Sequence, residues 1–118
     1  EKAVSHASIG SSGRSRIGIF LASKGRPLGS DEKLVDEEII NTSLAIMTSC
    51  GMYDYSGEYL AQVGIPAKSG VAGGVLAVVP NRFGIGVYAP ALDQYGNSLA
   101  GLELLKDLSK ELKLSIFS

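Results

Sequence analysis

Three short extended segments in the second half of the chain constrain its fold more than any other feature. Gly64 and Pro66 break the preceding pattern, and a strand that carries Lys68-Ser69-Gly70 begins there. Gly74–Val79 and Ile85–Ala89 read as two further strands, joined by a hairpin connection of sequence Pro-Asn-Arg-Phe. Consecutive strands with short connections pair side by side in antiparallel fashion, so the sequence predicts a three-stranded meander.

Two helical patterns precede these strands. Apolar residues at Ile17, Phe20 and Leu21 have the spacing of one helix face, and Lys24-Gly25 provides a basic last turn with a glycine stop. A second helix begins at the acidic residues 36–38 and ends near Cys50, with residues 26–33 as a surface loop between the two helices. Residues 54–63 fit either a short helix or an irregular loop.

The last segment, Asn97–Leu114, is the clearest helix. Leucines recur on one side of it, charged residues occupy another, and Asn97 or Ser98 serves as the N-cap. We expect this helix to pack on one face of the sheet. Helices before and after three consecutive strands predict an α+β fold with an antiparallel sheet and flanking helices.

Composition excludes several classes of partner. The chain has 118 residues, of which 45% are hydrophobic, so it suits a single packed domain. Its net charge of −1 and its lack of Trp argue against nucleic acid as a partner. The longest apolar run, residues 75–80, is far shorter than the roughly 20 residues that span a bilayer, and no secretory leader opens the chain. The single Cys50 fits a reducing compartment, so we expect a cytoplasmic protein that contacts no membrane.

The opening residues 1–16 differ from the rest of the chain. They are rich in Ser, Gly and other small residues and have no clear period, which predicts an atypical and flexible segment. His6 stands alone in this segment, so we interpret it as a surface residue, and metal binding has no support.

The Lys68-Ser69-Gly70 triplet points to acyl-transfer chemistry. Such a triplet is one of three motifs of β-lactamases and penicillin-binding proteins, where it faces an S-x-x-K nucleophile. Its surroundings are more specific, because residues 50–58 read CGMYDYSGE and residues 73–81 read GGVLAVVPN. Together with APALD at 89–93 and GNSLAG at 96–101, these strings resemble the serine-dependent glutaminases of bacteria and mitochondria, over roughly residues 17–117.

This resemblance implies a fold and a reaction. The fold would be the C-terminal part of a β-lactamase-like fold, so the chain would be either a single domain or a C-terminal fragment of a glutaminase domain. The reaction would be hydrolysis of L-glutamine to L-glutamate and ammonia through a serine acyl-enzyme, with no metal or organic cofactor. The nucleophile would lie in an earlier segment outside this chain, so independent catalysis is doubtful. Family members commonly assemble, which implies a homo-oligomer.

The resemblance also assigns two site residues. Tyr53 matches a family tyrosine whose phenol lies by the nucleophile and can relay a proton or hold the substrate. Tyrosines ionise with a reference pKa of about 10, so this role needs a cationic neighbour. Val71 matches a residue that binds substrate through its main chain, and its N–H at the end of an edge strand could act as an oxyanion donor. The ordinary alternatives are a packing tyrosine and a β-branched strand residue.

Other residues have less specific interpretations. Lys68 and Ser69 could orient substrate or catalytic groups, and glycines 70, 73 and 74 would allow close approach of the backbone. Residues 30–33 satisfy S-x-x-K but lie in a polar loop, so we interpret the match as coincidence. The remaining four tyrosines and Cys50 are interpreted as packing residues.

Two rival functions remain open. One is a catalytically silent domain that binds an amino acid or serves in assembly. The chain keeps the Lys68-Ser69-Gly70 side of the site but lacks the nucleophile that this side would face. The other is a second kind of Ser/Lys acyl-transfer protein that recognises β-lactams, which the Lys68-Ser69-Gly70 triplet alone would permit. A phosphate-binding loop is disfavoured, because Ala67 stands where a Walker loop needs glycine.

Overall fold

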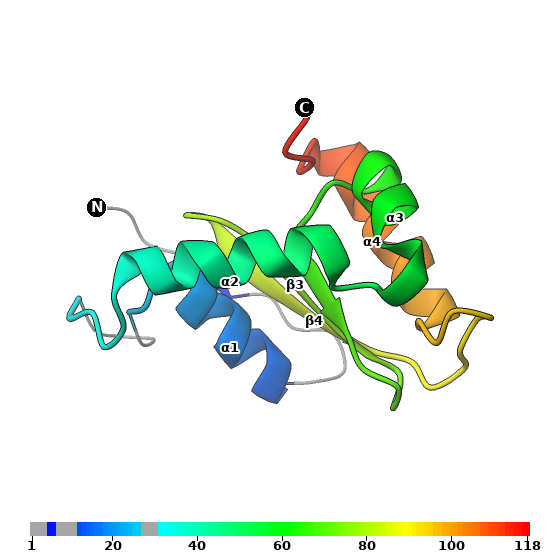
Figure 1. Cartoon of the computed structure of the whole chain (residues 1–118), viewed down its shortest axis with the longest axis horizontal. Helices are drawn as coiled ribbons and strands as arrows, with labels where there is room; N and C mark the ends of the chain where they lie inside the picture. Colours follow the sequence, from blue (N-terminus) through cyan, green and yellow to red (C-terminus); the bar gives the residue numbers. More distant parts are fainter. Residues whose placement is uncertain (1–4, 7–11, 27–30) are drawn as a thin grey trace.

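A computed structural model describes residues 5–6, 12–26 and 31–118 of the chain (Figure 1). It is an α+β structure with an antiparallel sheet core and flanking helices, as predicted. In chain order the elements are β1 (Ser5–His6), α1 (Ser12–Ala22), α2 (Glu37–Cys50), the 3-10 helix η1 (Tyr53–Tyr55), α3 (Ser56–Gln62), β2 (Ala67–Ser69), β3 (Gly74–Val79), β4 (Phe83–Tyr88) and α4 (Leu99–Leu112).

The sheet contains the predicted meander and one strand that was not predicted. Its strand order is β1-β4-β3-β2, with β2, β3 and β4 antiparallel and β1 parallel to β4. A two-residue strand is too short to show a period of two, so the opening segment contained no strand signal. Strand β2 lies at the other edge of the sheet, where its pairing with β3 places Lys68 opposite Leu76.

Strand β4 begins two residues earlier than predicted. Arg82 N–H donates to the Val79 carbonyl at 3.0 Å, so the turn needs only Pro80 and Asn81 as its central residues. Asn81 has a φ of 64°, a conformation that Asn tolerates better than most residues. Phe83 is thereby free to pair with Val79 in the ladder.

Helices cover both faces of the sheet. Alternate residues of β3, such as Val75 and Ala77, are buried in a larger core cluster with Leu105 of α4 and Tyr59 of α3. Val78 points to the opposite face and joins a smaller cluster with residues of α1 and α2. Figure 1 shows α3 and α4 grouped together, apart from α1 and α2.

Helix α1 approaches the sheet through a glycine contact. A Cβ atom on Gly84 of β4 would lie only 2.4 Å from the carbonyl carbon of Gly18, so both backbones must lack a side chain there. Helix α1 begins earlier than the spacing of its apolar residues indicated, and it ends at Ala22, just before the predicted Lys24-Gly25 stop.

The two longer helices have the predicted caps. The Asp36 side chain accepts from the Glu38 N–H at the start of α2, and the Ser98 hydroxyl accepts from the Gly101 N–H at the start of α4. Residues 54–63, left open between helix and loop, form most of η1 and all of α3. Over the described ranges no helix combines the length and apolar character needed to cross a bilayer.

Candidate functional site

Tyr53 begins η1 with a strained backbone. Its φ is 56°, in the left-handed region, where a residue with a Cβ pays about 1 to 2 kcal/mol. Its side chain is 36% exposed, so the ring is not held by burial. Strain of this kind persists only where the surroundings impose it, and it is found at functional sites more often than elsewhere.

Two buried polar side chains bond to the backbone on either side of Tyr53. The Ser56 hydroxyl accepts from the Met52 N–H at 2.9 Å and donates to the Tyr53 carbonyl at 2.7 Å. The Asn97 amide nitrogen donates to the Met52 carbonyl at 3.0 Å from a fully buried position. Every one of these bonds fixes a backbone group next to the strained φ.

The phenol of Tyr53 reaches the edge strand. Its hydroxyl donates to the Ser69 carbonyl at 3.4 Å, and the Lys68 ammonium donates to the same carbonyl. The Lys68 nitrogen also lies 5.0 Å from the centroid of the Tyr53 ring, within the range of a cation–π contact. A cationic side chain therefore lies beside the Tyr53 ring and shares an acceptor with its hydroxyl.

A backbone contact ties the end of α2 to the same strand. Ser69 N–H donates to the Gly51 carbonyl at 2.8 Å, so Gly51 covers the outer edge of β2 at this point. A Cβ on Gly51 would lie 1.8 Å from the Ala67 carbonyl oxygen, which only glycine avoids. The distance between the Tyr53 segment and β2 is therefore set by main-chain atoms.

Val71 lies in the turn that follows β2, two residues beyond the Ser69 carbonyl. Gly73 N–H donates to the Gly70 carbonyl at 3.0 Å, which makes Val71 the second residue of a four-residue turn instead of the end of a strand. The Val71 side chain is 72% exposed, and its N–H donates to no carbonyl of the described chain. Among the described residues, the Val71 N–H is thus a main-chain donor without a carbonyl partner.

The glycines around Val71 differ in what they allow. A Cβ on Gly73 would lie 2.6 Å from Pro90 Cα, so close backbone approach occurs there. A Cβ on Gly70 would meet nothing nearer than 3.9 Å, and the expectation of crowding at Gly70 is therefore wrong within the described chain. Gly70 instead closes the turn, because its N–H donates to the Gly74 carbonyl at 2.9 Å.

The loop before α4 packs against the Tyr53 ring. The Asp93 carboxylate accepts from the Tyr95 and Asn97 N–H groups at 2.8 and 3.0 Å. Gly96 adopts a φ of 95° and lies against Tyr53, since a Cβ there would be 3.6 Å from the ring carbon Cε2. Asn97 and Ser56 were not predicted as site residues, and the only signal at Asn97 was the Gly-Asn-Ser string within the family resemblance.

The other tyrosines lie apart from this arrangement. Tyr59 is 3% exposed, its hydroxyl has no hydrogen-bond partner among the described residues, and burial raises its pKa above the ordinary value. The Tyr55 ring packs on Tyr95 with centroids 5.2 Å apart, and its hydroxyl donates to Gln62 at 2.7 Å. Tyr88 lies on β4 and is half-exposed.

Three further predictions concern isolated side chains. Ser30 of the S-x-x-K match lies outside the described residues, and the Lys33 ammonium is paired with Glu37 at 2.6 Å. Cys50 is exposed, so its interpretation as a packing residue is wrong, and its thiol donates to the Ile46 carbonyl at 3.2 Å. The backbone of His6 belongs to β1. The side chains of residues 1–16 are not among those that the structure describes, so the interpretation of His6 as a surface residue stays a prediction.

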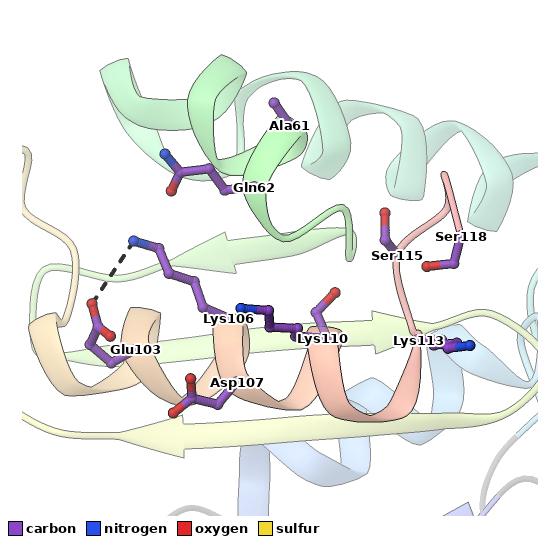
Figure 2. A pocket seen from close by; sticks show the side chains of 10 residues that line it. Ala61, Gln62, Glu103, Lys106, Asp107, Lys110, Lys113, Ser115 and Ser118 are labelled. Carbon is purple, nitrogen blue, oxygen red and sulfur yellow. Dashed lines mark ion pairs between the residues drawn. The ribbon is translucent and has the colours of Figure 1, made fainter.

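Two pockets lie away from Tyr53 and Val71. One, of about 560 Å³, runs between α3, α4 and the last residues, and Figure 2 shows lysines and acidic residues of α4 along it. Glu103 and Lys106 in this pocket approach each other to 3.9 Å. The other, of about 420 Å³, is lined by Tyr55, Tyr95 and neighbouring residues. Tyr53 and Val71 line neither of these two pockets, and their side chains are 36% and 72% exposed.

Comparisons with known proteins identify relatives of this chain. The sequence model of the family described as Glutaminase matches residues 6–117. The chain is 55% identical over 102 residues to the glutaminase of Clostridioides difficile (strain 630), which covers 86% of this chain and 33% of that relative. It is also 55% identical over 102 residues to the glutaminase of Geobacillus kaustophilus (strain HTA426), with the same coverage of 86% and 33%. The chain therefore spans about a third of the length of the curated relatives it matches.

A solved structure shares the fold. It is a Bacillus subtilis glutaminase in covalent complex with 5-oxo-L-norleucine, formed by reaction with 6-diazo-5-oxo-L-norleucine. The match has a TM-score of 0.84 and 45% identity, and it covers 87% of this chain and 38% of that structure. The predicted β-lactamase-like fold is confirmed for the part that the chain covers.

Proposed function

Because this chain belongs to the glutaminase family, we propose that it is the C-terminal part of an enzyme that hydrolyses L-glutamine to L-glutamate and ammonia. One observation carries the proposal: an exposed tyrosine on a strained backbone lies beside the Lys68 ammonium and donates to the Ser69 carbonyl. Val71 follows two residues later, and its N–H donates to no carbonyl of the described chain. The glutaminase name of the relatives favours amide hydrolysis over the recognition of β-lactams.

The proposed reaction has two halves. A serine hydroxyl from the part of the enzyme outside this chain attacks the side-chain carboxamide carbon, and its proton passes to the nitrogen that leaves as ammonia. Water then attacks the ester, which releases glutamate and restores the serine. An amide is a poor electrophile, so both halves need a donor for the developing oxyanion and a group that carries the proton.

Val71 and Tyr53 supply these two needs in the proposal. The Val71 N–H donates to the carboxamide oxygen when it becomes an oxyanion, since no carbonyl of the described chain competes for it. The Tyr53 phenol transfers the proton between serine and leaving nitrogen, with the Lys68 ammonium beside its ring. Both groups are exposed here because they face the part of the site that carries the serine.

The same proposal extends to the setting of the enzyme. No metal or organic cofactor takes part in the steps above, and L-glutamine is the small-molecule substrate. The single Cys50 favours a cytoplasmic location, and the near-neutral net charge disfavours nucleic acid. We place no membrane contact in the function and expect a homo-oligomer, as the family resemblance implies.

A glutamine analogue tests where the nucleophile lies. The chain of 12.3 kDa and a longer chain that includes the remaining two-thirds of the relatives' length are each treated with 6-diazo-5-oxo-L-norleucine. We expect ammonia release from glutamine and a covalent mass gain only in the longer chain. Labelling of the short chain would place a nucleophile within it and contradict the proposed division of the site.

A proline substitution tests the oxyanion donor. Val71 occupies the second position of its turn, where proline is favoured, so Val71→Pro removes the N–H while it keeps the turn. In the longer chain we expect kcat to fall by about 10²- to 10³-fold, whereas the control Val71→Ala keeps the N–H and the activity. Equal activity of the two variants would remove Val71 from the mechanism.

The alternative function is a catalytically silent domain that binds an amino acid or serves in assembly. It is favoured by one observation: the Lys33 ammonium of the sole S-x-x-K match is engaged by Glu37 and does not take part in the Tyr53 site. Glutamine binding by the longer chain, measured by calorimetry, without ammonia release would support this alternative against the enzyme.

A further inference from the structure

The backbone around Tyr53 is held by side chains from two different parts of the chain. Ser56 belongs to the first turn of α3, and Asn97 precedes α4 by two residues. Between them they bond to the Met52 N–H, the Met52 carbonyl and the Tyr53 carbonyl. These are the polar groups that change direction if the φ of Tyr53 relaxes to a negative value.

Burial makes these bonds costly to lose. Ser56 is 6% exposed and Asn97 is 0% exposed, so water cannot replace either partner. The orientation of the Asn97 amide is fixed by chemistry, because only its NH₂ group can donate to the Met52 carbonyl. Its backbone is fixed as well, since the Asp93 carboxylate accepts from the Asn97 N–H and the Asn97 carbonyl accepts from the Asp93 N–H.

The remaining contacts of Tyr53 are weaker. The phenol donates to the Ser69 carbonyl over 3.4 Å, the Lys68 ammonium lies 5.0 Å from the ring centroid, and the ring lies against Gly96. A side chain that is 36% exposed with so few contacts takes its direction from its backbone. Whatever sets the φ of Tyr53 therefore sets the direction of its Cα–Cβ bond, from which the ring and hydroxyl project.

We propose that Asn97 and Ser56 are positioning residues, which hold Tyr53 in its left-handed conformation and thereby aim its phenol into the reaction site. The proposal deepens the proposed function and rests on it for the role of the phenol. Both residues bond to the backbone around Tyr53 and are given no substrate contact in this role. Asn97 acts through the Met52 carbonyl, and Ser56 acts through the Met52 N–H and the Tyr53 carbonyl.

The first test measures geometry in the 118-residue chain, without activity. The three-bond HN–Hα coupling of Tyr53 depends on φ, and it is compared by NMR in the wild type, Asn97→Asp, Ser56→Ala and Ser56→Thr. Asn97→Asp keeps the shape of the side chain but removes its donor. We expect the coupling to change in Asn97→Asp and Ser56→Ala and to be retained in Ser56→Thr, which keeps the hydroxyl.

Ser109→Ala is the matched control. Ser109 is also a buried serine, at 5% exposed, and its hydroxyl donates to the Val63 carbonyl at 2.6 Å, away from Tyr53. Its loss should destabilise the fold to a similar extent without any change of the Tyr53 coupling. A change in Ser109→Ala as large as that in Ser56→Ala would overturn the proposal, as would unchanged couplings in Asn97→Asp and Ser56→Ala.

The second test measures turnover in the longer chain described above. We expect Asn97→Asp and Ser56→Ala to lower kcat by about 10²-fold with little change of KM, because the phenol is displaced while substrate contacts remain. The same substitutions should have almost no further effect in a Tyr53→Phe background. Full additivity with Tyr53→Phe would overturn the positioning role. If Tyr53→Phe alone leaves kcat unchanged, the proposed function fails at Tyr53, and the couplings still decide the geometric claim.

Discussion

Tyr59 shows what one buried hydroxyl does to stability. Its ring belongs to the larger core cluster, but its buried hydroxyl has no hydrogen-bond partner in the part of the chain that the structure describes. An unsatisfied buried hydroxyl costs free energy that phenylalanine would not pay. We expect Tyr59→Phe to raise the free energy of unfolding by about 1 kcal/mol, measured by urea denaturation at neutral pH. The control Tyr55→Phe removes a bonded hydroxyl, so it should not stabilise.

The same residue predicts a pH dependence. Burial raises the pKa of Tyr59 above its ordinary value of 10.0, so above about pH 10 the unfolded chain loses a proton that the folded chain keeps. The free energy of unfolding must therefore fall as pH rises, by about 1.4 kcal/mol per pH unit from this group. Urea titrations between about pH 9 and 11 should show a shallower fall for Tyr59→Phe than for the wild type. Parallel curves for the two proteins would contradict the burial of this phenol.

Gly51 is the residue whose substitution should do the most damage. An added Cβ would lie 1.8 Å from the Ala67 carbonyl oxygen and 2.5 Å from that of Met47. We expect Gly51→Ala to lower the free energy of unfolding by about 3 kcal/mol or more, because backbone must move on both sides. Gly57→Ala is the matched control, since nothing lies within 4 Å of its added Cβ in α3. That change should be neutral or stabilising by up to about 1 kcal/mol, and equal losses in both variants would be inconsistent with this packing.

The N-caps of α2 and α4 differ in burial, so they should differ in how much each contributes to the free energy of unfolding. Ser98 is fully buried; its hydroxyl accepts from the Gly101 N–H and donates to the Ala89 carbonyl. Asp36 is exposed and makes a longer bond of 3.3 Å to the Glu38 N–H. We expect Ser98→Ala to lower the free energy of unfolding by roughly 2 kcal/mol and Asp36→Ala to lower it by roughly 0.5 kcal/mol, measured by thermal and urea unfolding. The reverse order would show that Ser98 does not cap α4 in solution.

The elements that could be predicted from sequence were those long enough to show the spacing of apolar and polar residues that is typical of a helix or a strand. The leucines of α4 and the acidic start of α2 show the helical period over several turns, and Gly74–Val79 was predicted with its observed bounds. Strand β1 has two residues, and the turn at Val71 depends on hydrogen bonds between Gly70 and its neighbours. Neither leaves a periodic signal in the chain.

The site could be predicted only in part, for a related reason. Tyr53 and Val71 were assigned through the resemblance, and Lys68 was expected to orient nearby groups, which its contact with the Tyr53 ring supports. Ser56 and Asn97 meet at Met52 from segments 41 residues apart in the sequence. Their meeting depends on the packing of α3 and α4 against one face of the sheet, which no local pattern of residues contains.

At the scale of the whole molecule, the two faces of the sheet are unequal. Among the side chains that the structure describes, the cluster under α3 and α4 has many buried residues, whereas Ala22, Ile40, Leu44 and Val78 are the buried members of the cluster under α1 and α2. Apolar burial is the main favourable term in folding, so the α1–α2 side should open first. Hydrogen exchange of the described amides should therefore show lower protection in α1 than in β3 and α4.

Two side-chain truncations, also followed by hydrogen exchange, test the contributions of the two faces of the sheet one at a time. Leu44→Ala removes a side chain from the smaller cluster, and it should lower protection mainly in α1 and α2. Leu105→Ala removes a fully buried side chain from the larger cluster. It should lower the free energy of opening of amides throughout the described chain by about 2 to 5 kcal/mol. A uniform loss in both variants would mean that the molecule opens as a single cooperative unit.

The left-handed backbone of Tyr53 has a consequence for chemical synthesis. Cys50 is the single cysteine of the sequence and lies three residues before Tyr53, so two peptides can be joined at Cys50 by ligation without any substitution. Residue 53 can then be a fluorinated tyrosine, whose phenol is more acidic with nearly the same shape. It can also be a D-amino acid, which is relaxed at the positive φ where L-tyrosine is strained. The fluorinated tyrosine changes the acidity of the phenol and leaves the backbone as it is, whereas the D-residue relieves the backbone strain and also redirects the side chain.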